Sequence, residues 1–414
     1  MSNKFTVHLD FMGEQHVVGS LFFLSRGNRE SASFYYDEKW LQNPLGFALQ
    51  PSLPFALGSN NTEPGEKLFG CFSDCSPDRW GRTLMQRRES NLAKADKRQA
   101  RTLLERDYLL QVNDLVRQGG IRFTAEGSKQ FLAPPETGLP SLHNLRELLA
   151  AARNVSEKKE TTDDLQLLFQ PGGSLGGARP KASVQNNNGK LLIAKFPKND
   201  DEWDIPLWEY VSFELAKRAG LRTPEATLEK IDNMNILLVS RFDRMDGGGR
   251  IPFASAMTLL AAHDGDRRSY LEIGEILSTD GSSPKDDWHE LFRRMVFNIL
   301  TSNFDDHLRN HGFLREQGGW RLSPVYDLES TPNKFPEHQT YLNLYSGESS
   351  LDLAFEHLED FSLSLTEAKA ITKKVAAAVK TWETVARQVG AHKNDLEVME
   401  HAYARQELGK ALQM

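Results

Sequence analysis

Cysteine is scarce in this sequence, because Cys71 and Cys75 are the only two among 414 residues. Two thiols without a nearby histidine cluster cannot complete a four-ligand zinc site, so we expect both to be free. The sequence also has no run of about eighteen apolar residues, and residues 1–5 lack the apolar core of a signal peptide. These absences argue against a membrane-spanning helix, and we expect a cytoplasmic protein of bacterial type.

An excess of positive charge is absent as well. The chain has 50 Lys and Arg residues against 57 Asp and Glu residues, a formal charge of −7. This balance argues against the whole molecule being a strong nucleic-acid binder. Basic clusters at residues 79–88 and 94–106 are more typical of solvated helix faces than of phosphate-binding tracks, although a supporting role in a DNA-bound assembly stays open.

The length of 414 residues predicts about two or three domains. The first 140 residues begin with β-strand patterns, turn helical, and end in a Pro- and Gly-rich connector at 132–140. We therefore expect an N-terminal region over 1–140, a second region over 141–245 and a helical third region over 246–414.

The stretch 301–310 organises the chain. It supplies a carboxylate at Asp305 and an amide at Asn310, and a second carboxylate follows at Asp327. A loop Asp can accept the proton of an attacking hydroxyl, and an amide and a carboxylate can ligate the Mg²⁺ that bridges ATP phosphates. Asp and Asn are common in loops, so the spacing alone is weak. In its context it predicts a kinase in which Asp305 orients the nucleophile.

That context is a rigid element on each side of the loop. Apolar residues recur at three- and four-residue steps over 287–300, which predicts a helix with one buried face. A hairpin is predicted over 312–322, with its turn at Gln317-Gly318-Gly319. The catalytic groups would then lie on a loop that is fixed at both ends.

A glycine-rich stretch over 171–181 contains neither the Walker pattern nor G-x-G-x-x-G. Its glycines would let backbone N–H groups approach an anion closely, and a flexible surface loop is an equally good interpretation. A hairpin follows over 181–196, with a strong turn signal at 186–189. Its second strand carries Lys195 among apolar residues, which favours a phosphate partner over a solvated sheet edge.

A helix is predicted over 207–219, ended by Gly220. Glu209 in its first turn is a candidate partner for Lys195, as in the strand-lysine and helix-glutamate pair of kinases. Glu214 competes for that role, and a plain surface carboxylate is the remaining alternative.

The order of the predicted elements is that of a two-lobed kinase: hairpin, helix, a strand at 235–239, a turn at 246–249, helices and catalytic loop. A helical pattern over 364–390 begins at a capping box, and 394–414 is typical of one more helix, either core or docking surface. We therefore expect an α+β fold of protein-kinase type with two lobes, an extra N-terminal β-rich subdomain and a helical C-terminal lobe.

Further motifs occur in a fixed order along nearly the whole chain. In the first quarter they are VGSL at 18–21, YDEKWL at 36–41, LP at 53–54 and FSDCSPDRWGR at 72–82. Later they are GSLGGARPK at 173–181, RFDR at 241–244, Asp305-x-His307-x-x-Asn310 and PVYD at 324–327. With these motifs the chain resembles the HipA-type toxin Ser/Thr kinases of bacterial type II toxin–antitoxin modules.

The resemblance implies a Ser/Thr protein kinase that uses ATP and Mg²⁺, with Asp305 as catalytic base and Asn310 and Asp327 as metal ligands. The implied ATP-binding residues are Gly176, Gly177, Ala178, Arg179, Pro180, Lys181, Lys195, Ser240, Arg241, Phe242, His307, Asn310, Tyr326 and Asp327. Ser174 matches the serine that such kinases autophosphorylate, which ejects the glycine-rich loop and switches the enzyme off. Ser240 departs from an acidic residue in a known member, which matters little if backbone atoms bind adenine.

Known relatives inactivate translation by phosphorylating an aminoacyl-tRNA synthetase, and a helix-turn-helix antitoxin of HipB type neutralises them on operator DNA. The resemblance thus implies a protein substrate such as a synthetase or another translation factor, an antitoxin partner, DNA contact mainly through that antitoxin, and no membrane partner. One alternative is a catalytically silent relative that binds the antitoxin on DNA. Another is a metal-dependent phosphoesterase with Asp305, Asp306 and His307 as ligands, which lacks a second ligand cluster.

Overall fold

The computed structural model describes residues 3–27, 29–133, 138–172, 177–332 and 337–414, and the chain forms two compact units. Unit 1 comprises Met1–Asn199, Ile231–Met234 and Asp243–Ala254, and unit 2 comprises Asp200–Lys230, Asn235–Phe242 and Ser255–Met414. Each unit is therefore built from segments that are distant in the sequence. The sequence-based division into three regions stays a prediction. No helix in the described ranges is long and apolar enough to cross a membrane.

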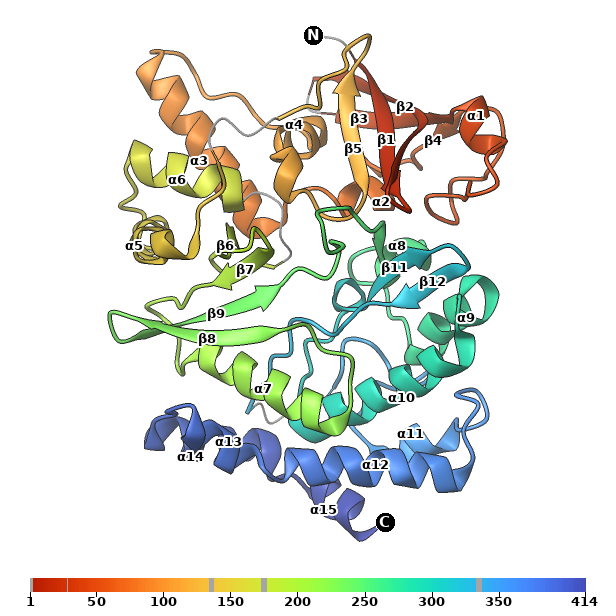
Figure 1. The fold of residues 1–414 in the computed structure, drawn as a ribbon, viewed down its shortest axis with the longest axis vertical. Coiled ribbons are helices and arrows are strands. Elements are labelled where there is room, and N and C mark those ends of the chain that lie inside the picture. The colour runs from red at the N-terminus through yellow and green to blue at the C-terminus, as the bar shows by residue number, and fades with distance from the viewer. Residues whose placement is uncertain (1–2, 28, 134–137, 173–176, 333–336) are drawn as a thin grey trace. The chain divides into compact units, whose positions relative to one another are not determined.

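Unit 1 begins with a five-stranded sheet, which confirms the β-rich start predicted from the sequence. Its strands are β1 (Lys4–Phe11), β2 (Glu14–Arg26), β3 (Arg29–Tyr36), β4 (Asn60–Asn61) and β5 (Ile121–Ala125). They lie in the order β4-β3-β2-β1-β5, and the neighbours are antiparallel (Figure 1). Alternate residues of β1, from Phe5 to Phe11, are buried, because successive side chains of a strand point to opposite faces.

The helices of unit 1 follow this sheet. They are α1 (Glu38–Leu41), α2 (Gly70–Ser73), α3 (Arg79–Ala95), α4 (Glu105–Gln111), α5 (Leu145–Ser156) and α6 (Thr162–Gly172), with the 3₁₀ helices η1 (Asp114–Val116) and η2 (Leu142–Asn144). α6 packs against both α3 and α5. Cys71 and Cys75 are buried and free, as expected.

Unit 1 ends with the predicted hairpin of β6 (Lys181–Gln185) and β7 (Leu191–Lys195). Its turn places Gly189 at φ +76°, a left-handed conformation that suits glycine. The antiparallel register sets Lys181 directly opposite Lys195, so the two lysines share one face of the hairpin. The indole nitrogen of Trp80 in α3 donates to the Lys181 carbonyl at 3.0 Å, which fixes the start of β6.

Unit 2 is mainly helical. Its first elements are α7 (Ile205–Ala219), β8 (Ala226–Ile231) and β9 (Met234–Ser240), and β10 (Phe253–Ser255) lies where the chain passes from unit 1 to unit 2. Then come α8 (Ala256–Leu259), α9 (Tyr270–Asp280), α10 (Pro284–Thr301), η3 (Leu308–Asn310), β11 (Gly312–Glu316) and β12 (Gly319–Leu322). The last are α11 (Leu351–Glu356), α12 (Leu365–Val379), α13 (Trp382–Gln388), α14 (Lys393–Tyr403) and α15 (Gln406–Gln413).

Helix α10 is the centre of unit 2, because α7, α9, α11, α12, α14 and β12 all contact it (Figure 1). Helix α7 packs in addition on α12 and α13. At that contact Trp208 lies against Trp382 and Tyr403, with ring centroids 6.1 Å away in both cases, while Trp382 and Tyr403 stack at 5.2 Å. The beginning and the end of unit 2 thus share one aromatic core.

The structure corrects two helix predictions. The helical pattern over 364–390 is two helices, since α12 ends at Val379 and α13 begins at Trp382. The tail beyond residue 393 also forms two helices, α14 and α15, in place of one. The predicted helices over 207–219 and 287–300 and the hairpin over 312–322 are confirmed as α7, α10 and β11–β12.

Candidate active site

The catalytic loop predicted from the sequence starts with a sharp change of backbone direction. Ser302 ends α10 in the left-handed region, with φ +54°, and the backbone N–H of Asn303 returns to the carbonyl of Asn298 at 3.0 Å. Nearly all of the last two turns of α10 is buried, and the loop that follows is largely buried as well, with Asp305 and Arg309 as its exposed residues.

The loop brings Asp305 and Asn310 together. The Asn310 side-chain nitrogen donates to the Asp305 backbone carbonyl at 2.9 Å, and the Asn310 backbone N–H donates to His307 at 2.7 Å. Because its nitrogen is engaged in this way, Asn310 presents Oδ1 as the end of its amide that can ligate a cation. Asp305 is exposed and accessible to an acceptor, whereas His307 is half-buried.

Asp327 is held by the chain that leaves β12. The backbone N–H groups of Ser323 and Val325 donate to Gly312 and Arg222, both at 2.8 Å. Asp327 itself has φ +51°, an uncommon conformation for a residue with a side chain, and such strain often accompanies a functional site.

The two parts of the site are tied to each other within unit 2. The phenol of Tyr326 donates to the Arg309 carbonyl at 2.6 Å, which joins the Asp327 segment to the catalytic loop. Tyr326 also packs against Phe242, with ring centroids 5.6 Å apart, so two of the predicted ATP-binding residues form an aromatic pair. The neighbouring Ser240 and Arg241 are buried, and the Ser240 backbone N–H donates to Glu225 at 2.8 Å.

Negative charge is concentrated around Asp305. Partial desolvation raises the pKa of its carboxyl above the ordinary value. Asp306 and Asp327 raise that pKa further, and His307 opposes them. A bound cation would relieve this repulsion, and carboxylate and amide oxygens are the ligands that Mg²⁺ prefers.

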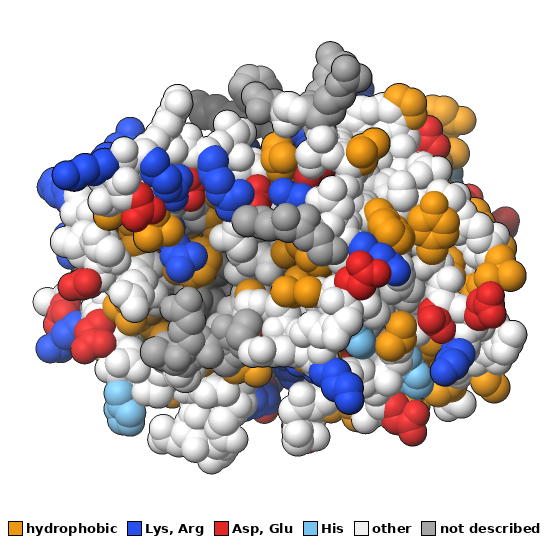
Figure 2. Space-filling view, turned by 90° about the horizontal axis from the view of Figure 1, so that it is seen from above, with side chains coloured by type: hydrophobic (Ala, Val, Ile, Leu, Met, Phe, Trp, Pro, Cys, Tyr) orange, Lys and Arg blue, Asp and Glu red, His pale blue; other side chains and the backbone are white. Residues whose placement is uncertain are grey.

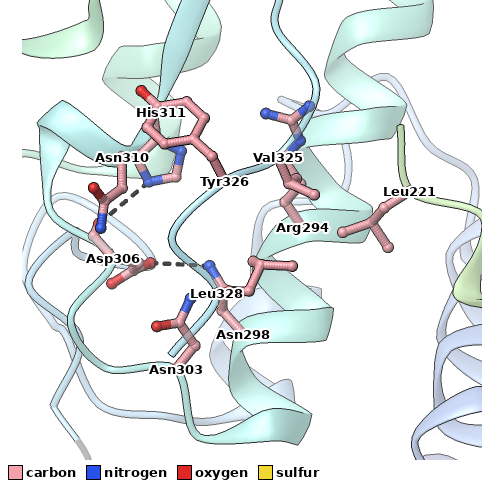
Figure 3. Close-up of a pocket in the computed structure, with 10 residues that line it drawn as sticks. All are labelled: Leu221, Arg294, Asn298, Asn303, Asp306, Asn310, His311, Val325, Tyr326 and Leu328. Carbon is pink, nitrogen blue, oxygen red and sulfur yellow. Dashed lines mark hydrogen bonds between the residues drawn. The ribbon is translucent and has the colours of Figure 1, made fainter. Parts of the chain in front are cut away.

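Asp306 faces the interior, where its carboxylate anchors the loop to neighbouring side chains. It is 1% exposed, and its Oδ2 accepts a hydrogen bond from the Tyr270 phenol and another from Asn298 at 3.4 Å. Figure 3 shows the Asp306 carboxylate and the Asn298 amide, which both line a small pocket, pointing toward each other. The Asp306 carbonyl lies 3.2 Å from Nε2 of His311, whose burial lowers its pKa to about 4.

The donor set fits magnesium with few protein ligands. The described part of the chain has no group of three or more His, Cys, Asp and Glu residues that could hold a metal ion. Mg²⁺ commonly uses one or two carboxylates and completes its shell with phosphate oxygens and water, so the two ligands predicted at Asn310 and Asp327 would fit it. The phosphoesterase alternative needs Asp306 as a ligand, and the bonds from Tyr270 and Asn298 already engage that carboxylate.

Comparison with known protein families identifies two matching regions. The model of the HipA-like C-terminal domain matches residues 173–383, about half of the chain, and that of the HipA N-terminal domain matches residues 9–106. The chain belongs to the HipA family. This confirms the resemblance drawn from the motifs.

The HipA-type fold is also seen in a solved structure. A chain of the Shewanella oneidensis MR-1 toxin–antitoxin complex of HipA, HipB and operator DNA superposes with a TM-score of 0.67 at 17% identity, covering 99% of this chain and 97% of that chain. Likeness at this identity establishes the fold, and it confirms the predicted α+β class with a β-rich N-terminal part and a helical C-terminal part.

Curated relatives match shorter stretches. "Putative kinase Y4dM" of Sinorhizobium fredii is 31% identical over 158 residues, which cover 34% of this chain and 38% of that protein. "Toxin YjjJ" of Escherichia coli is 24% identical over 245 residues, which cover 52% of this chain and 48% of that protein. The HipA-family chain thus spans about half the length or less of these relatives.

The remaining predicted site residues of this HipA-family chain belong to other segments than the catalytic loop and the Asp327 segment. In unit 1, Gly177 has φ +99°, Ala178 is exposed, Arg179 is half-buried, and Pro180 and Lys181 are buried. Lys181 lies 3.7 Å from Asp78, at the N-terminus of α3. Ser174 and Gly176 lie outside the described residues.

Lys195 is half-buried on β7 in unit 1, and Glu209 is buried in α7 of unit 2, 3% exposed. Their pairing stays a prediction.

Several arginines of the predicted basic clusters form ion pairs with carboxylates. Figure 2 shows Lys and Arg side chains gathered at one side of the drawn face, with Asp and Glu side chains between them. The ion pairs in and after α3 include Arg82–Glu105, Arg87–Glu160 and Arg98–Glu89, each at 2.6 Å. This pairing agrees with solvated helix faces and not with a phosphate-binding track.

Three residues around the catalytic loop were not predicted. They are Tyr270, Gln339 and Thr340, whose side chains donate to Asp306 Oδ2, Asp305 Oδ1 and the Asp306 carbonyl. They lie 34 to 36 positions in the sequence from the loop residues that they contact, outside any motif, so no local signal marks them.

Proposed function

We propose that this HipA-family protein is an ATP-dependent Ser/Thr protein kinase that acts as the toxin of a toxin–antitoxin module. The main support is the loop geometry: Asn310 is bonded to the Asp305 backbone at 2.9 Å, and Asp327 lies close enough to influence the pKa of Asp305. An exposed carboxylate beside two oxygen ligands for Mg²⁺ suits phosphoryl transfer, which needs positioning and charge neutralisation more than covalent chemistry.

In this proposal Asp305 accepts the proton of the attacking hydroxyl, and Asn310 and Asp327 hold Mg²⁺. The bound metal would neutralise charge on the phosphates of ATP. Lys181 and Lys195 lie directly opposite each other on one face of the β6–β7 hairpin, so positive charge is concentrated there even with Asp78 3.7 Å from Lys181. They are therefore suited to contact phosphates, together with the stretch 176–180.

The adenine would lie near the Phe242–Tyr326 pair and the backbone of residues 240–242, with His307 also against the nucleotide. The aromatic pair offers a flat apolar surface, and a backbone contact would not depend on the departure at Ser240. Glu209 would then pair with Lys195, as in other kinases.

The wider role rests on the family. We propose that the kinase inhibits translation by phosphorylating an aminoacyl-tRNA synthetase or another translation factor, and that a HipB-type antitoxin restrains it. The Shewanella oneidensis complex of HipA, HipB and operator DNA supports such an antitoxin, with DNA reached mainly through it. Autophosphorylation at Ser174 would switch the kinase off.

The test is the intact mass of the purified protein after incubation with Mg-ATP, beside an Asp305→Asn variant. We expect one added phosphate that maps to Ser174 in the wild type and none in the variant. If unphosphorylated wild-type protein binds ATP but gains no phosphate and transfers none to a translation factor, a silent protein that binds the antitoxin on operator DNA becomes the better description.

A further inference from the structure

The segment His338–Thr340 alternates between buried and exposed side chains. His338 and Thr340 are 2% and 0% exposed, whereas Gln339 between them is exposed. The chain bends at Gln339 and Thr340, and the side chains on either side of Gln339 turn into the interior. The two buried residues therefore anchor the backbone, and Gln339 projects from it toward the surface that carries the site.

This segment is hydrogen-bonded to the catalytic loop on both sides of Asp305. The Gln339 backbone N–H donates to the Phe304 carbonyl at 3.1 Å, and the Thr340 hydroxyl donates to the Asp306 carbonyl at 2.6 Å. His338 adds a contact from Nδ1 to Oδ1 of Asp306 at 3.4 Å. The backbone flanking Asp305 is thus fixed without any contribution from the Gln339 side chain.

The Gln339 side chain reaches the catalytic carboxylate itself. Its Nε2 donates a hydrogen bond to Oδ1 of Asp305. A carboxylate whose first oxygen is held by a neutral donor cannot rotate freely about its terminal bond, so the second oxygen keeps one direction. A general base needs such a fixed direction toward the hydroxyl that it deprotonates.

We propose that Gln339 is a positioning residue for phosphoryl transfer, holding Oδ1 of Asp305 so that Oδ2 faces the acceptor hydroxyl. This inference rests on the proposed kinase function. It assigns to Gln339 an effect on turnover and none on ATP binding, since its hydrogen bonds join it to the base and to the loop backbone.

A merely structural role predicts a different result. Gln339 is exposed, and substitutions at exposed positions usually leave stability almost unchanged. His338 and Thr340 stay in place to hold the segment in any Gln339 variant. A loss of rate without a loss of stability would therefore report on the hydrogen bond to Asp305.

The experiment compares Gln339→Met, Gln339→Lys and Glu337→Gln with the full-length wild type. Met and Lys have stems of similar length, but only Lys ends in a donor. Glu337 is an exposed residue directly before this segment and serves as the control. The measurement is the single-turnover rate of phosphate incorporation by intact mass over a range of Mg-ATP concentrations, with the unfolding temperature of each variant.

We expect Gln339→Met to lower the maximal rate roughly 10- to 100-fold, the size of effect seen when a reacting group is slightly misplaced. The Mg-ATP concentration at half-maximal rate and the unfolding temperature should not change. Gln339→Lys should recover a substantial part of the rate, and Glu337→Gln should match the wild type.

Several results would overturn the inference. A Gln339→Met variant as fast as the wild type would show that the bond does not position the base. A faster variant would show that Gln339 obstructs Asp305, and a changed Mg-ATP dependence at unchanged maximal rate would make it a nucleotide contact. If wild-type protein binds Mg-ATP but transfers no phosphate, the kinase proposal fails and this inference fails with it.

Discussion

The carboxylates of Asp305 and Asp327 have different neighbours, and we expect different consequences when each is replaced. Asp305 is exposed beside the amide of Asn310, whereas Asp327 lies in a strained backbone position that is tied to the loop through Tyr326. The first is suited to a reacting proton, and the second to a metal ion.

The Asp305→Asn variant should therefore bind Mg-ATP almost as the wild type does but transfer phosphate roughly two to four orders of magnitude more slowly, the usual range for loss of a general base. Asp327→Asn should weaken the binding of Mg-ATP itself, because it removes a charged metal ligand. Calorimetric titration with Mg-ATP and phosphate incorporation by intact mass separate the two effects. Unchanged nucleotide affinity in Asp327→Asn would contradict the metal assignment.

His311 should make the stability of unit 2 sensitive to mild acid. Burial lowers its pKa from the ordinary 6.5 to about 4, so the unfolded chain takes up a proton first as the pH falls. Its stabilising contribution is complete above pH 6.5 and is lost as the pH falls toward 4. Between pH 7 and pH 5 the cost is about 2 kcal/mol. Urea unfolding of wild type and His311→Gln at both pH values measures it, and equal losses in the two proteins would refute it.

At the residue scale, the sequence predicted the residues within a motif and not those that support them. Asp305 and Asn310 are five positions apart, so a short loop brings them together and their spacing shows it. Gln339 and Tyr270 reach the same loop only through the tertiary fold. Their side-chain types are common on any surface or in any core, so no pattern separates them from other residues.

At the scale of helices and strands, hydrophobic periodicity predicted that a helix exists better than it predicted where the helix begins and ends. The apolar step of α12 continues into α13, so the pattern from Ile371 to Val389 shows no break. Thr381 lies at the break, directly before α13, and its hydroxyl donates to the Ala378 carbonyl at 2.7 Å. Such a local side-chain bond competes with the helix without disturbing the apolar pattern.

The packing of α9 on α10 depends on a glycine. A Cβ at Gly274 would overlap the ring of Trp288, which its own bond to Ser278 at 2.9 Å holds in place. Gly274→Ala should destabilise the protein by about 1–3 kcal/mol, the usual cost of overpacking. Thermal unfolding measures the change.

A second glycine in a helix provides the matched control for that substitution. A Cβ added at Gly409 in α15 would meet nothing within 4 Å beyond its own helix backbone and its two chain neighbours. Gly409→Ala should therefore be neutral or stabilising by up to about 1 kcal/mol, because alanine is the better helix former. If both variants shift the unfolding temperature alike, the Trp288 contact is not what constrains Gly274.

At the scale of the whole molecule, the order of segments along the sequence does not show which of them form the same compact unit. The chain leaves unit 1 for unit 2 at residue 200 and returns twice before it stays in unit 2 from Ser255 onward. Composition and turn signals locate connectors along the sequence, but they cannot reveal that a strand belongs with elements far away. Membership of a compact unit is a property of packing, which is why the three-region division was the least constrained prediction.

The last two helices extend beyond the matched C-terminal domain, which ends at residue 383, and yet they support the catalytic loop. The Ser302 hydroxyl donates to the Ala402 carbonyl at 2.7 Å, the Arg405 guanidinium lies 5.1 Å from the centre of the Phe304 ring, and Tyr403 is fully buried. These contacts favour a core role over a docking role for the tail. We therefore expect the tail to be required for folding and for activity, although it contains none of the predicted site residues.

Deleting residues 393–414 should lower the free energy of unfolding by about 3 kcal/mol or more, as for the loss of a large buried aromatic residue. Phosphate incorporation should fall at least about tenfold, because the loop that carries Asp305 loses its contacts with Ala402 and Arg405. The control is Leu412→Ser, an exposed change within the same tail that should alter stability by less than about 0.5 kcal/mol. Thermal unfolding and intact mass after Mg-ATP treatment provide both measurements. A deletion variant that unfolds and reacts like the wild type would make the tail an appended docking element.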